Sequence, residues 1–408
     1  MASKWPLCPL VQLTDNFDDK RIPVKEADRN TGPYPYYGAS GIVDYVDSYI
    51  FDGEYLLIAE DGENLRTRNT PIAFLATGKY WVNNHAHVVK GNSRADTRYL
   101  MYALRHVDYS GFLSGSTMPK LTQGNLNRIP IPTPPLLEQR RIATVLGSLD
   151  DKIEHNNRMN ETLEAMAQAL FKSWFVDFNP VKAKAAGKIT GLPKEIDRLF
   201  PSSFQVSELG KIPKDWNVGI IGDLADVVGG STPSTKESTY WVNGTNNWVT
   251  PKDLSALKYP VLLSTERCIT DAGLATIGSG LLPKGTVLMS SRAPIGYLAI
   301  AEIPVAINQG FIAMKPKEGM SNLHLLSWAR HSQELIISRA NGSTFLEISK
   351  SSFRPLPIVI PPQQVIDAFD VQARSLHNRI VMNEKESKSL TEVRDTLLPK
   401  LVSGKITG

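Results

Sequence analysis

Gly187-Lys-Ile-Thr-Gly191 occurs again, letter for letter, as Gly404-Lys-Ile-Thr-Gly408, and it ends each half of a duplicated chain. When the halves are aligned 227 positions apart, Gly115-Ser-Thr117 falls on Gly342-Ser-Thr344 without a gap. Ten additional residues follow in the first half, which places the two final motifs 217 positions apart. An internal repeat of this size determines the architecture before any single motif does. The sequence therefore predicts two similar units in one chain.

Two segments predicted to be long helices carry seam residues that alternate at spacings of four and three. This heptad pattern indicates coiled-coil pairing. Each seam becomes polar at its middle, which lowers stability but fixes the register of the pairing. The first seam comprises Ile142, Leu146, Leu149, Ile153, Asn156, Asn160, Leu163, Ala167, Leu170 and Trp174, and the second comprises Phe369, Ala373, Leu376, Ile380, Asn383, Ser387, Leu390, Arg394, Leu397 and Leu401.

The connectivity predicts the direction of these helices. The first must carry the chain away from one globular unit and the second must bring it back, so we expect them to be antiparallel with facing polar centres. Each helix starts just after a proline pair, Pro134-Pro135 or Pro361-Pro362, and proline geometry suits a helix start. The alternative is that each helix is an ordinary amphipathic helix packed on its own domain.

Length and composition indicate two domains with connecting elements. A chain of 408 residues is too long for one ordinary core. Cys8 and Cys268 lie at unmatched positions of the two halves, so we expect no disulfide framework and a reducing cytoplasm. Neither a signal peptide nor a membrane span is expected. The net charge of +4 permits DNA binding without requiring it.

The globular units contain short apolar runs broken by glycine, proline and asparagine, which are typical of strands in a mixed sheet. Each unit also has one expected helix, near Thr97 to Val107 and Leu323 to Ser338. The predicted class is α+β, with two mixed α/β domains in tandem. Residues 29–38 have no sequence counterpart in 229–248, so we expect the interior loops to differ. The predicted domains are 1–133, a helical region and linker at 134–210, a second domain at 211–358, and a second helical region at 359–408.

The region before each long helix carries a specific motif. Ile129-Pro-Ile-Pro132 leads into Pro134-Pro-Leu-Leu-Glu-Gln-Arg-Arg-Ile-Ala143, and the second half has Leu356-Pro-Ile-Val-Ile-Pro-Pro-Gln-Gln364. With the GKITG endings, these residues make the chain resemble the specificity subunits of type I restriction-modification systems over essentially its whole length. The second copy departs from the pattern at Gln363-Gln-Val-Ile-Asp367, so the two helices are not expected to contact partners identically.

This resemblance implies a DNA-recognition subunit without catalysis of its own. It implies double-stranded DNA as ligand and, as partners, two adenine methyltransferase subunits and two motor-nuclease subunits. The residues agree with a non-catalytic role, because Asp177-Phe-Asn-Pro-Val181 lacks the second proline and the aromatic residue of an amino-methyltransferase loop. No Walker A loop occurs either. The pair His85 and His87 lacks a nearby cysteine or carboxylate cluster, which favours a structural role. We expect no catalytic residues, no cofactor and no metal.

Candidate DNA contacts are side chains that suit phosphates or base edges. The repeated Gly-Ser-Thr loops supply Ser116, Thr117, Lys120, Ser343, Thr344 and Lys350 as expected phosphate contacts, although such a turn is often only a helix cap. The unmatched loops supply Tyr36, Tyr37, Arg66, Arg68 and Lys79 in the first unit, and Lys236, Asn246, Asn247, Lys252 and Arg292 in the second, as expected base readers. Each alone also fits a solvated surface residue.

A helix of about 40 residues is roughly 60 Å long, so the helix pair would separate two recognition domains related by a pseudo-two-fold axis. We therefore expect a bipartite, asymmetric target with an unread gap. Candidates for partner docking are Arg140, Arg141, Lys152 and Arg158, for which an ordinary solvated face is the alternative. Two other hypotheses remain: a self-contained nuclease-methyltransferase, which would bind S-adenosylmethionine, and an adaptor that binds protein alone, which would show no salt-dependent DNA affinity.

Overall fold

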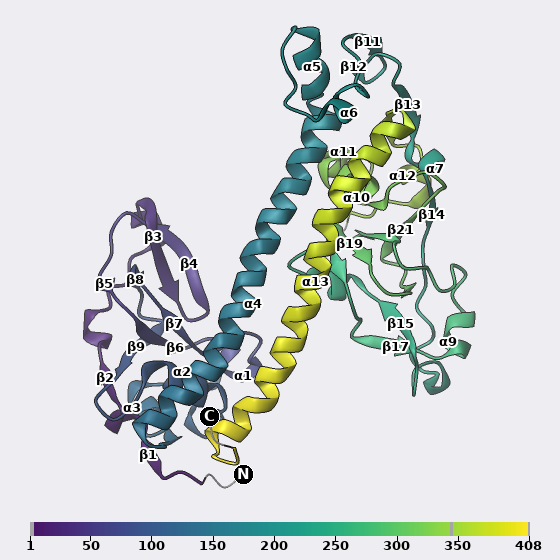
Figure 1. The fold of residues 1–408 in the computed structure, drawn as a ribbon. Coiled ribbons are helices and arrows are strands. Elements are labelled where there is room, and N and C mark those ends of the chain that lie inside the picture. The colour runs from purple at the N-terminus through teal and green to yellow at the C-terminus, as the bar shows by residue number, and fades with distance from the viewer. Residues whose placement is uncertain (1–3, 343–345, 407–408) are drawn as a thin grey trace. The chain divides into compact units, whose positions relative to one another are not determined.

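The computed structural model describes residues 4–342 and 346–406, and the chain forms two compact units (Figure 1). Unit 1 consists of Met1–Glu154 together with Ser387–Gly408, and unit 2 consists of His155–Glu386. The boundaries between the units fall within the two longest helices. Each unit therefore combines one α+β domain with helical residues that come from both halves of the sequence.

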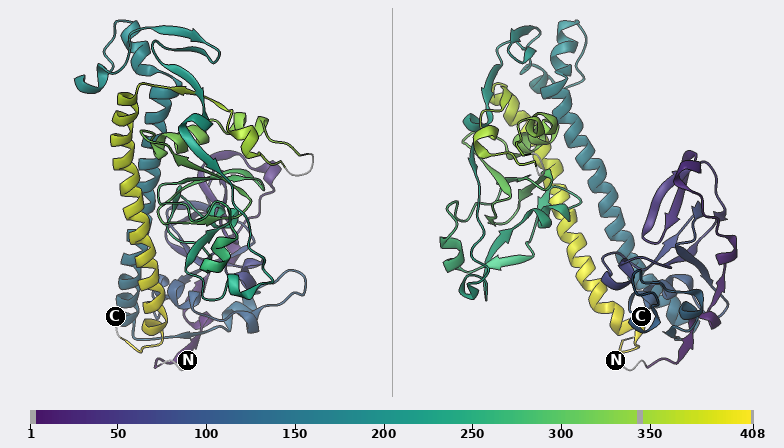
Figure 2. Two further views of the ribbon diagram at one scale, coloured as in Figure 1. Left: turned by 90° about the vertical axis from the view of Figure 1, so that its right-hand side faces the viewer. Right: turned by 180° about the vertical axis from the view of Figure 1, so that it is seen from behind.

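The two long helices are α4, Leu136–Phe171, and α13, Gln363–Val402. None of the positions predicted for the two seams is exposed. Within unit 2 the segments are antiparallel, because Asn156 lies near Asn383 while Phe171 contacts Phe369 at a ring distance of 6.0 Å. Figure 2 shows the helices side by side from two further directions. In the described parts of the chain, 4–342 and 346–406, no helix has the length and apolar character that crossing a membrane requires.

The polar centre of the helix pair is a buried hydrogen-bond network in unit 2. Asn160 and Asn383 are 0% and 1% exposed. The Asn383 amide donates to Oδ1 of Asn160 at 2.8 Å, and the Asn160 amide donates to Oε1 of Glu384 at 2.7 Å. Burial raises the pKa of the Glu384 carboxyl above its ordinary value. Buried amides need such partners, so this network favours one register of the two segments.

A second polar contact fixes the domain of unit 1 to both helices. Asp150 of α4 accepts hydrogen bonds from the Tyr102 hydroxyl at 2.8 Å and from Arg105 at 3.1 Å. Its other oxygen accepts from Arg394 of α13 at 2.7 Å. Burial would raise the pKa of Asp150, but its bonds from Arg394 and Tyr102 hold that pKa below the ordinary value. Arg394 therefore occupies a position of the predicted seam as an ion-pair partner.

The sheets of unit 1 have a simple topology. A four-stranded antiparallel sheet has the order β2-β9-β6-β7, a second sheet has the order β4-β3-β8-β5, and β1 pairs with β10. Helix α2 covers β6, β7 and β9. The bounds are β1 Leu7–Pro9, β2 Thr14–Asn16, β3 Thr31–Gly38, β4 Gly41–Val46, β5 Phe51–Asp52, β6 Tyr55–Ala59, α1 Asn64–Thr67, β7 Ala73–Ala76, β8 Lys79–Val82, β9 Ala86–Gly91, α2 Thr97–Arg105, α3 Gln123–Asn127 and β10 Pro130–Pro132.

Unit 2 has a related topology, but its main sheet has a fifth strand, β16, and its second sheet has three strands rather than four. Its main sheet has the order β14-β21-β18-β19-β16, its second sheet has the order β17-β15-β20, and β13 pairs with β22. The bounds are α5 Asn179–Ala185, α6 Lys194–Asp197, β11 Phe204–Ser207, β12 Gly210–Pro213, β13 Asn217–Ile220, α7 Ile221–Leu224, β14 Ala225–Val228, β15 Asn246–Val249, α8 Pro251–Ser255, β16 Val261–Leu262, β17 Arg267–Ile269, α9 Asp271–Ala275, β18 Val287–Ser291, β19 Ile295–Ala301, β20 Ala306–Ile307, β21 Phe311–Pro316, α10 Asn322–His331, α11 Gln333–Ser338, α12 Lys350–Phe353 and β22 Pro357–Ile360.

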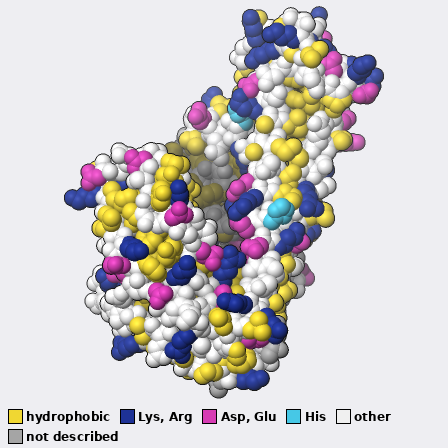
Figure 3. Space-filling view, turned by 60° about the vertical axis from the view of Figure 1, so that its left-hand side comes forward, with side chains coloured by type: hydrophobic (Ala, Val, Ile, Leu, Met, Phe, Trp, Pro, Cys, Tyr) yellow, Lys and Arg dark blue, Asp and Glu magenta, His cyan; other side chains and the backbone are white. Residues whose placement is uncertain are grey.

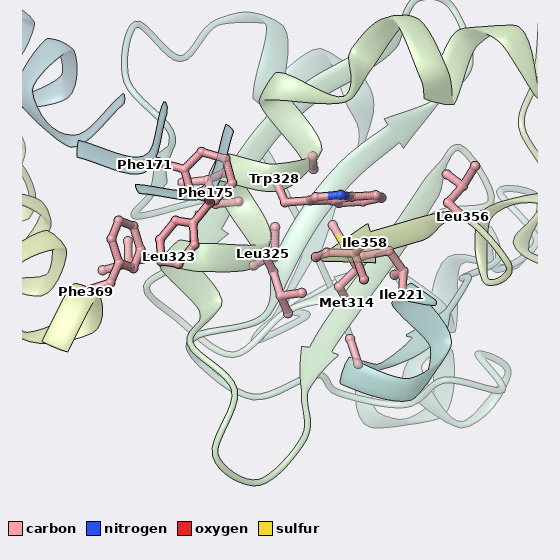
Figure 4. Packing of buried hydrophobic residues seen from close by; sticks show 14 of the residues in the cluster. Phe171, Phe175, Ile221, Met314, Leu323, Leu325, Trp328, Leu356, Ile358 and Phe369 are labelled. Carbon is pink, nitrogen blue, oxygen red and sulfur yellow. The ribbon is translucent and has the colours of Figure 1, made fainter. Parts of the chain in front are cut away.

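The core of unit 2 joins its domain to the helices. Phe171, Phe175 and Phe369 pack with Leu323 and Trp328 in one buried cluster (Figure 4). The expected α+β class and the tandem repeat are confirmed by these elements. Two details differ from expectation. The helix expected near 323–338 is interrupted at Ser332, and β15 is the topological counterpart of β3, although residues 29–38 lack a sequence counterpart there.

Both GKITG motifs end a helix with the same backbone geometry. The Gly187 and Lys188 amides donate to the carbonyls of Lys184 and Ala183, and the Gly404 and Lys405 amides donate to those of Leu401 and Lys400. Each glycine has a left-handed φ, 66° and 73°, as a Schellman helix end requires. The first motif follows α5 whereas the second follows α13. The ten additional residues of the first half therefore lie in the π-helical segment Lys172–Val176, the turn and α5.

We expect Asn383→Ala to destabilise unit 2 by roughly 1–3 kcal/mol, because Oδ1 of buried Asn160 would lose its donor. Urea unfolding followed by circular dichroism would show a lower midpoint. Asn378→Ala, an exposed position on the same helix, is the matched control and should change little. Equal effects of the two substitutions would contradict a stabilising role of the amide network.

Candidate nucleic-acid interface

The two Gly-Ser-Thr loops are closed by the same backbone contact. Ser114 and Lys120 exchange two hydrogen bonds of 2.8 and 2.7 Å, and Asn341 and Glu347, each 227 positions later, exchange two of 2.9 Å. Gly115 has a φ of 87°, and a Cβ atom there would lie 2.2 Å from the carbonyl oxygen of Met118. The loop of unit 1 therefore requires glycine at this position.

Each loop is anchored directly after its closing contact. Leu121 and Ile348 are 0% and 1% exposed, so both belong to the cores of their units. The next residues, Thr122 and Ser349, cap short helices by accepting from backbone amides three residues on. Both loops are therefore held in the same way: backbone hydrogen bonds close the loop, a buried residue follows, and the next residue caps a short helix.

The charges at the two loop bases are reversed. In unit 1, Lys120 pairs with Glu60 at 3.2 Å, whereas in unit 2 Glu347 pairs with Arg292 at 3.5 Å. Glu347, rather than Lys350, thus lies at the position that corresponds to Lys120. Lys350, the lysine predicted to contact phosphate in the second unit, is the first residue of α12.

A partly buried network of charged groups supports the loop of unit 1. His87 is 1% exposed, and its ring nitrogens lie 2.6 Å from Oδ2 of Asp18 and 2.7 Å from the carbonyl oxygen of Leu121. Arg21 donates to Glu60 at 2.7 Å. Burial would raise the pKa of Glu60, but the bond from Arg21 and the nearby His87 and Lys120 hold it below the ordinary value.

The first histidine of the expected pair, His85, lies 2.8 Å from Asp61. Both histidines therefore have carboxylate partners. Within residues 4–342 and 346–406, no group of three or more His, Cys, Asp or Glu side chains is placed to hold a metal ion.

The residues of unit 1 that were predicted to contact DNA lie partly on the surface and partly in the core. Arg66 is exposed and donates to the carbonyls of Gly115 and Ser116 at 3.4 and 3.3 Å, so it contacts the repeated loop. Tyr36 is only 1% exposed, and its hydroxyl bonds to the backbone of Val24. It is therefore a core residue and unavailable for base contact. Ser116, Thr117 and Lys120 are exposed, Arg68 is exposed above Tyr109, Lys79 is exposed over Tyr49, and Tyr37 is half-buried against Tyr80.

The residues of unit 2 that were predicted to contact DNA have separate, local partners. The side-chain amides of Asn246 and Asn247 bond to Asp271 and to the carbonyl of Pro304, and Lys252 pairs with Glu266 at 2.8 Å. Lys236 is exposed, and Arg292 is linked to the repeated loop through Glu347. Ser343 and Thr344 lie outside the described residues.

Some exposed features were missed by the sequence reasoning. Met118 in the first loop is 59% exposed and Leu346 in the second is 48% exposed. Arg267 lies over the ring of Trp241 with a distance of 3.7 Å to the centroid. The β4 strand exposes Ile42, Val43 and Tyr45. The apolar run of residues 41–46 between two turns was the available signal for this last surface.

The basic candidates of α4 lie in mixed surroundings. Arg140 and Arg141 are exposed near its start, Arg158 is exposed and Lys152 is half-buried. Arg141 lies 3.7 Å from Glu138. Figure 3 shows a face on which basic and acidic side chains are interspersed. Local contacts rather than one large basic field would therefore have to carry any electrostatic recognition on this face.

Comparison with known proteins identifies the family. The family model described as type I restriction modification DNA specificity domain matches residues 8–165 and 213–374, more than half of the chain. The chain therefore belongs to the family of type I restriction modification DNA specificity domains.

Individual relatives agree with this assignment. The type I restriction enzyme MjaIX specificity subunit of Methanocaldococcus jannaschii is 37% identical over 195 residues, covering 47% of this chain and 45% of that protein. The chain thus spans about half the length of this relative. The HindI specificity subunit of Haemophilus influenzae is 27% identical over 342 residues, covering 71% and 72%. The crystal structure of an S subunit from M. genitalium, 16% identical, has a TM-score of 0.64 over 98% of this chain and 96% of that one, which shows a shared fold.

We expect the network under the first loop to make unit 1 sensitive to acid. The pKa of folded Glu60 lies below its ordinary value, so its contribution is complete above that ordinary value and is lost as pH falls through the lowered one. The thermal midpoint should therefore decrease at acidic pH, and Glu60→Gln should lower the free energy of unfolding at pH 7 by roughly 1–3 kcal/mol. Glu63→Gln, an exposed neighbour, is the control. A Glu60→Gln protein as stable as the parent at pH 7 would contradict this role.

Proposed function

We propose that the chain is the DNA sequence-recognition subunit of a type I restriction-modification complex and reads a bipartite, asymmetric site in double-stranded DNA. The observation that carries this proposal is the pair of loops with the same closure, Ser114 to Lys120 and Asn341 to Glu347, in two copies of a specificity domain. Each copy would read one half of the target.

The chemistry of the loops supports this function. Exposed Ser116, Thr117, Lys120 and Arg66 offer donors that suit phosphate oxygens and base edges. The charges at the loop bases are opposite in the two units. Because the two loops would present different electrostatic surroundings to DNA, we infer that the half-sites differ in sequence.

The two long helices would act as the spacer. We propose that they form an antiparallel coiled coil that relates the domains by a pseudo-two-fold axis. The 36 residues of α4 correspond to about 54 Å, whereas half-sites on one face of DNA recur every 34–36 Å. This length leaves room for an unread gap. We retain 1–133 and 211–358 as the recognition domains, with 134–210 and 359–408 as the helical regions.

The same proposal defines the partners. The chain would bind two adenine-N6 methyltransferase subunits, and two motor-nuclease subunits in the full complex. Arg140, Arg141, Lys152 and Arg158 remain candidates for these contacts. A subunit that serves such a complex would work on DNA in the cytoplasm.

The function is tested by sequencing modified bases in DNA from cells that co-express this chain and the methyltransferase encoded beside it. A split motif with one methylated adenine on each strand is expected. Exchanging residues 1–133 for those of a relative should then change one half of the motif only. A change in both halves would contradict modular recognition, and unmodified DNA from a folded complex would favour the protein-binding adaptor.

We expect Gly115→Ala to weaken DNA binding by about tenfold, because a Cβ at the left-handed φ collides with Met118 and distorts the first loop. Fluorescence anisotropy on a duplex with the identified motif measures the affinity. Gly111→Ala is the matched control, since a Cβ there meets nothing within 4 Å. Unchanged affinity of Gly115→Ala would remove the loop from the interface.

A further inference from the structure

Arg267, at the start of β17, stacks on an aromatic surface of unit 2. Its guanidinium carbon lies 3.7 Å from the centroid of the Trp241 ring and 5.4 Å from that of the Trp248 ring. The shorter distance requires a roughly parallel arrangement, because a perpendicular guanidinium would bring a nitrogen into the ring. The plane of the Arg267 side chain is therefore set by Trp241.

The two tryptophans are themselves fixed. Their rings meet edge to face with centroids 5.0 Å apart. The indole N–H of Trp241 donates to the carbonyl of Ser234 at 3.0 Å, and that of Trp248 donates to the carbonyl of Ser231 at 3.3 Å. Trp248 is only 3% exposed and belongs to a small hydrophobic core. The arginine therefore rests on a rigid support, which reduces the conformational entropy that it would lose on binding a ligand.

The donors of Arg267 have no acceptor within the fold. The side chain is exposed, and in the described part of the chain its guanidinium contacts the two rings without forming a hydrogen bond or an ion pair. The carboxylates near it in the sequence have other partners. Glu266 pairs with Lys252 at 2.8 Å, and Asp271 accepts from the Asn246 amide at 2.9 Å. A stacked guanidinium with an open edge can donate two parallel hydrogen bonds to a ligand in its own plane.

The corresponding place in unit 1 has a different arrangement. In the β4·β3 pair, Asp44 lies across from Tyr36. In the corresponding β17·β15 pair, Arg267 lies across from Trp248. Arg29 lies over the Tyr36 ring with 4.4 Å to the centroid and donates to Asp44 at 3.0 Å. The stacked arginine of unit 1 thus has an acceptor inside the fold, whereas the donors of the stacked arginine of unit 2 remain open to a ligand.

We propose that Arg267 is a specificity-determining residue that reads a guanine in the half-site of unit 2. This inference rests on the proposed function, which supplies double-stranded DNA as the ligand. In the major groove guanine presents two adjacent acceptors, O6 and N7, which match two in-plane donors of a guanidinium. Adenine presents N7 beside a donor, cytosine presents a donor, and thymine presents one acceptor beside a methyl group. A phosphate accepts from many directions, so the fixed plane set by Trp241 favours a base edge.

The first test leaves the protein unchanged. Exchanging residues 1–133 identifies the half-site of unit 2, which is the half that stays the same. Each guanine of that half is then replaced in turn by 7-deazaguanine, which pairs with cytosine but lacks the N7 acceptor. The full chain co-purified with its methyltransferase should bind one of these duplexes about fivefold more weakly in fluorescence anisotropy, because one of two hydrogen bonds is lost.

The second test changes the arginine. Arg267→Met keeps an unbranched side chain on Trp241 but removes the donors. It should bind the unmodified duplex about tenfold more weakly and should not distinguish guanine from 7-deazaguanine at that position. In cells, its methylated motif should become degenerate at that base pair alone. Arg198→Met removes the same charge from an exposed position at the end of α6, outside the sheets. This matched control should keep both the affinity and the motif.

Equal affinity of the wild-type complex for all the 7-deazaguanine duplexes would overturn the inference, whether or not the variant folds. A unit 2 half-site without guanine on either strand would also overturn it. So would an unchanged motif in Arg267→Met, and weaker binding of that variant to every sequence would then indicate a phosphate contact. If the wild-type complex bound no duplex in a sequence-dependent way, the proposed function itself would fail, which distinguishes that outcome from the others.

Discussion

The buried amide contact between Asn160 and Asn383 restrains the helix pair on which both units depend. An apolar seam alone permits neighbouring registers, but a shift would place these amides against aliphatic side chains and leave them without partners. The restraint matters because each unit is completed by helical residues from the other half. Leu398 and Leu401 pack in the core of unit 1, and Phe171 packs in that of unit 2. The pairing of the helices and the formation of both cores therefore depend on each other.

The two Gly-Ser-Thr loops show how one shared backbone arrangement can carry different side chains. Each loop is closed by backbone hydrogen bonds and anchored by a buried residue, Leu121 or Ile348. Backbone closure depends little on side-chain identity, so the ion pair beside it can reverse from Lys120 with Glu60 to Glu347 with Arg292. Sheet topology is also retained while strand sequences differ, since parallel pairs β3·β8 and β15·β20 occupy equivalent places. The shared backbone therefore determines the position of each loop more strongly than the side chains that the loop contains.

Features with a period or a repeat could be predicted from the sequence, whereas features made by distant contacts could not. The heptad located α4 and α13 because burial follows helical geometry. The repeat located both loops, but it could not show that Lys350 begins a helix after the second loop. Tyr36 was taken for a surface residue because nothing local reveals its bond to Val24. His87 contacts Asp18 and Leu121, which lie 69 and 34 residues away in the sequence. No local sequence pattern could reveal these contacts.

Positions that remain identical between diverged halves can be sorted by the physical restraint that keeps them. Asn156 and its counterpart Asn383 are kept by burial in the helix pair, and Gly187 and Gly404 by their left-handed backbone. Both restraints lie inside the fold. Ile189 has neither, because it is almost fully exposed and has no special backbone geometry. An exposed isoleucine costs solubility and gains no packing within its own chain. The retention of isoleucine in both motifs is therefore explained neither by burial of Ile189 nor by its backbone geometry.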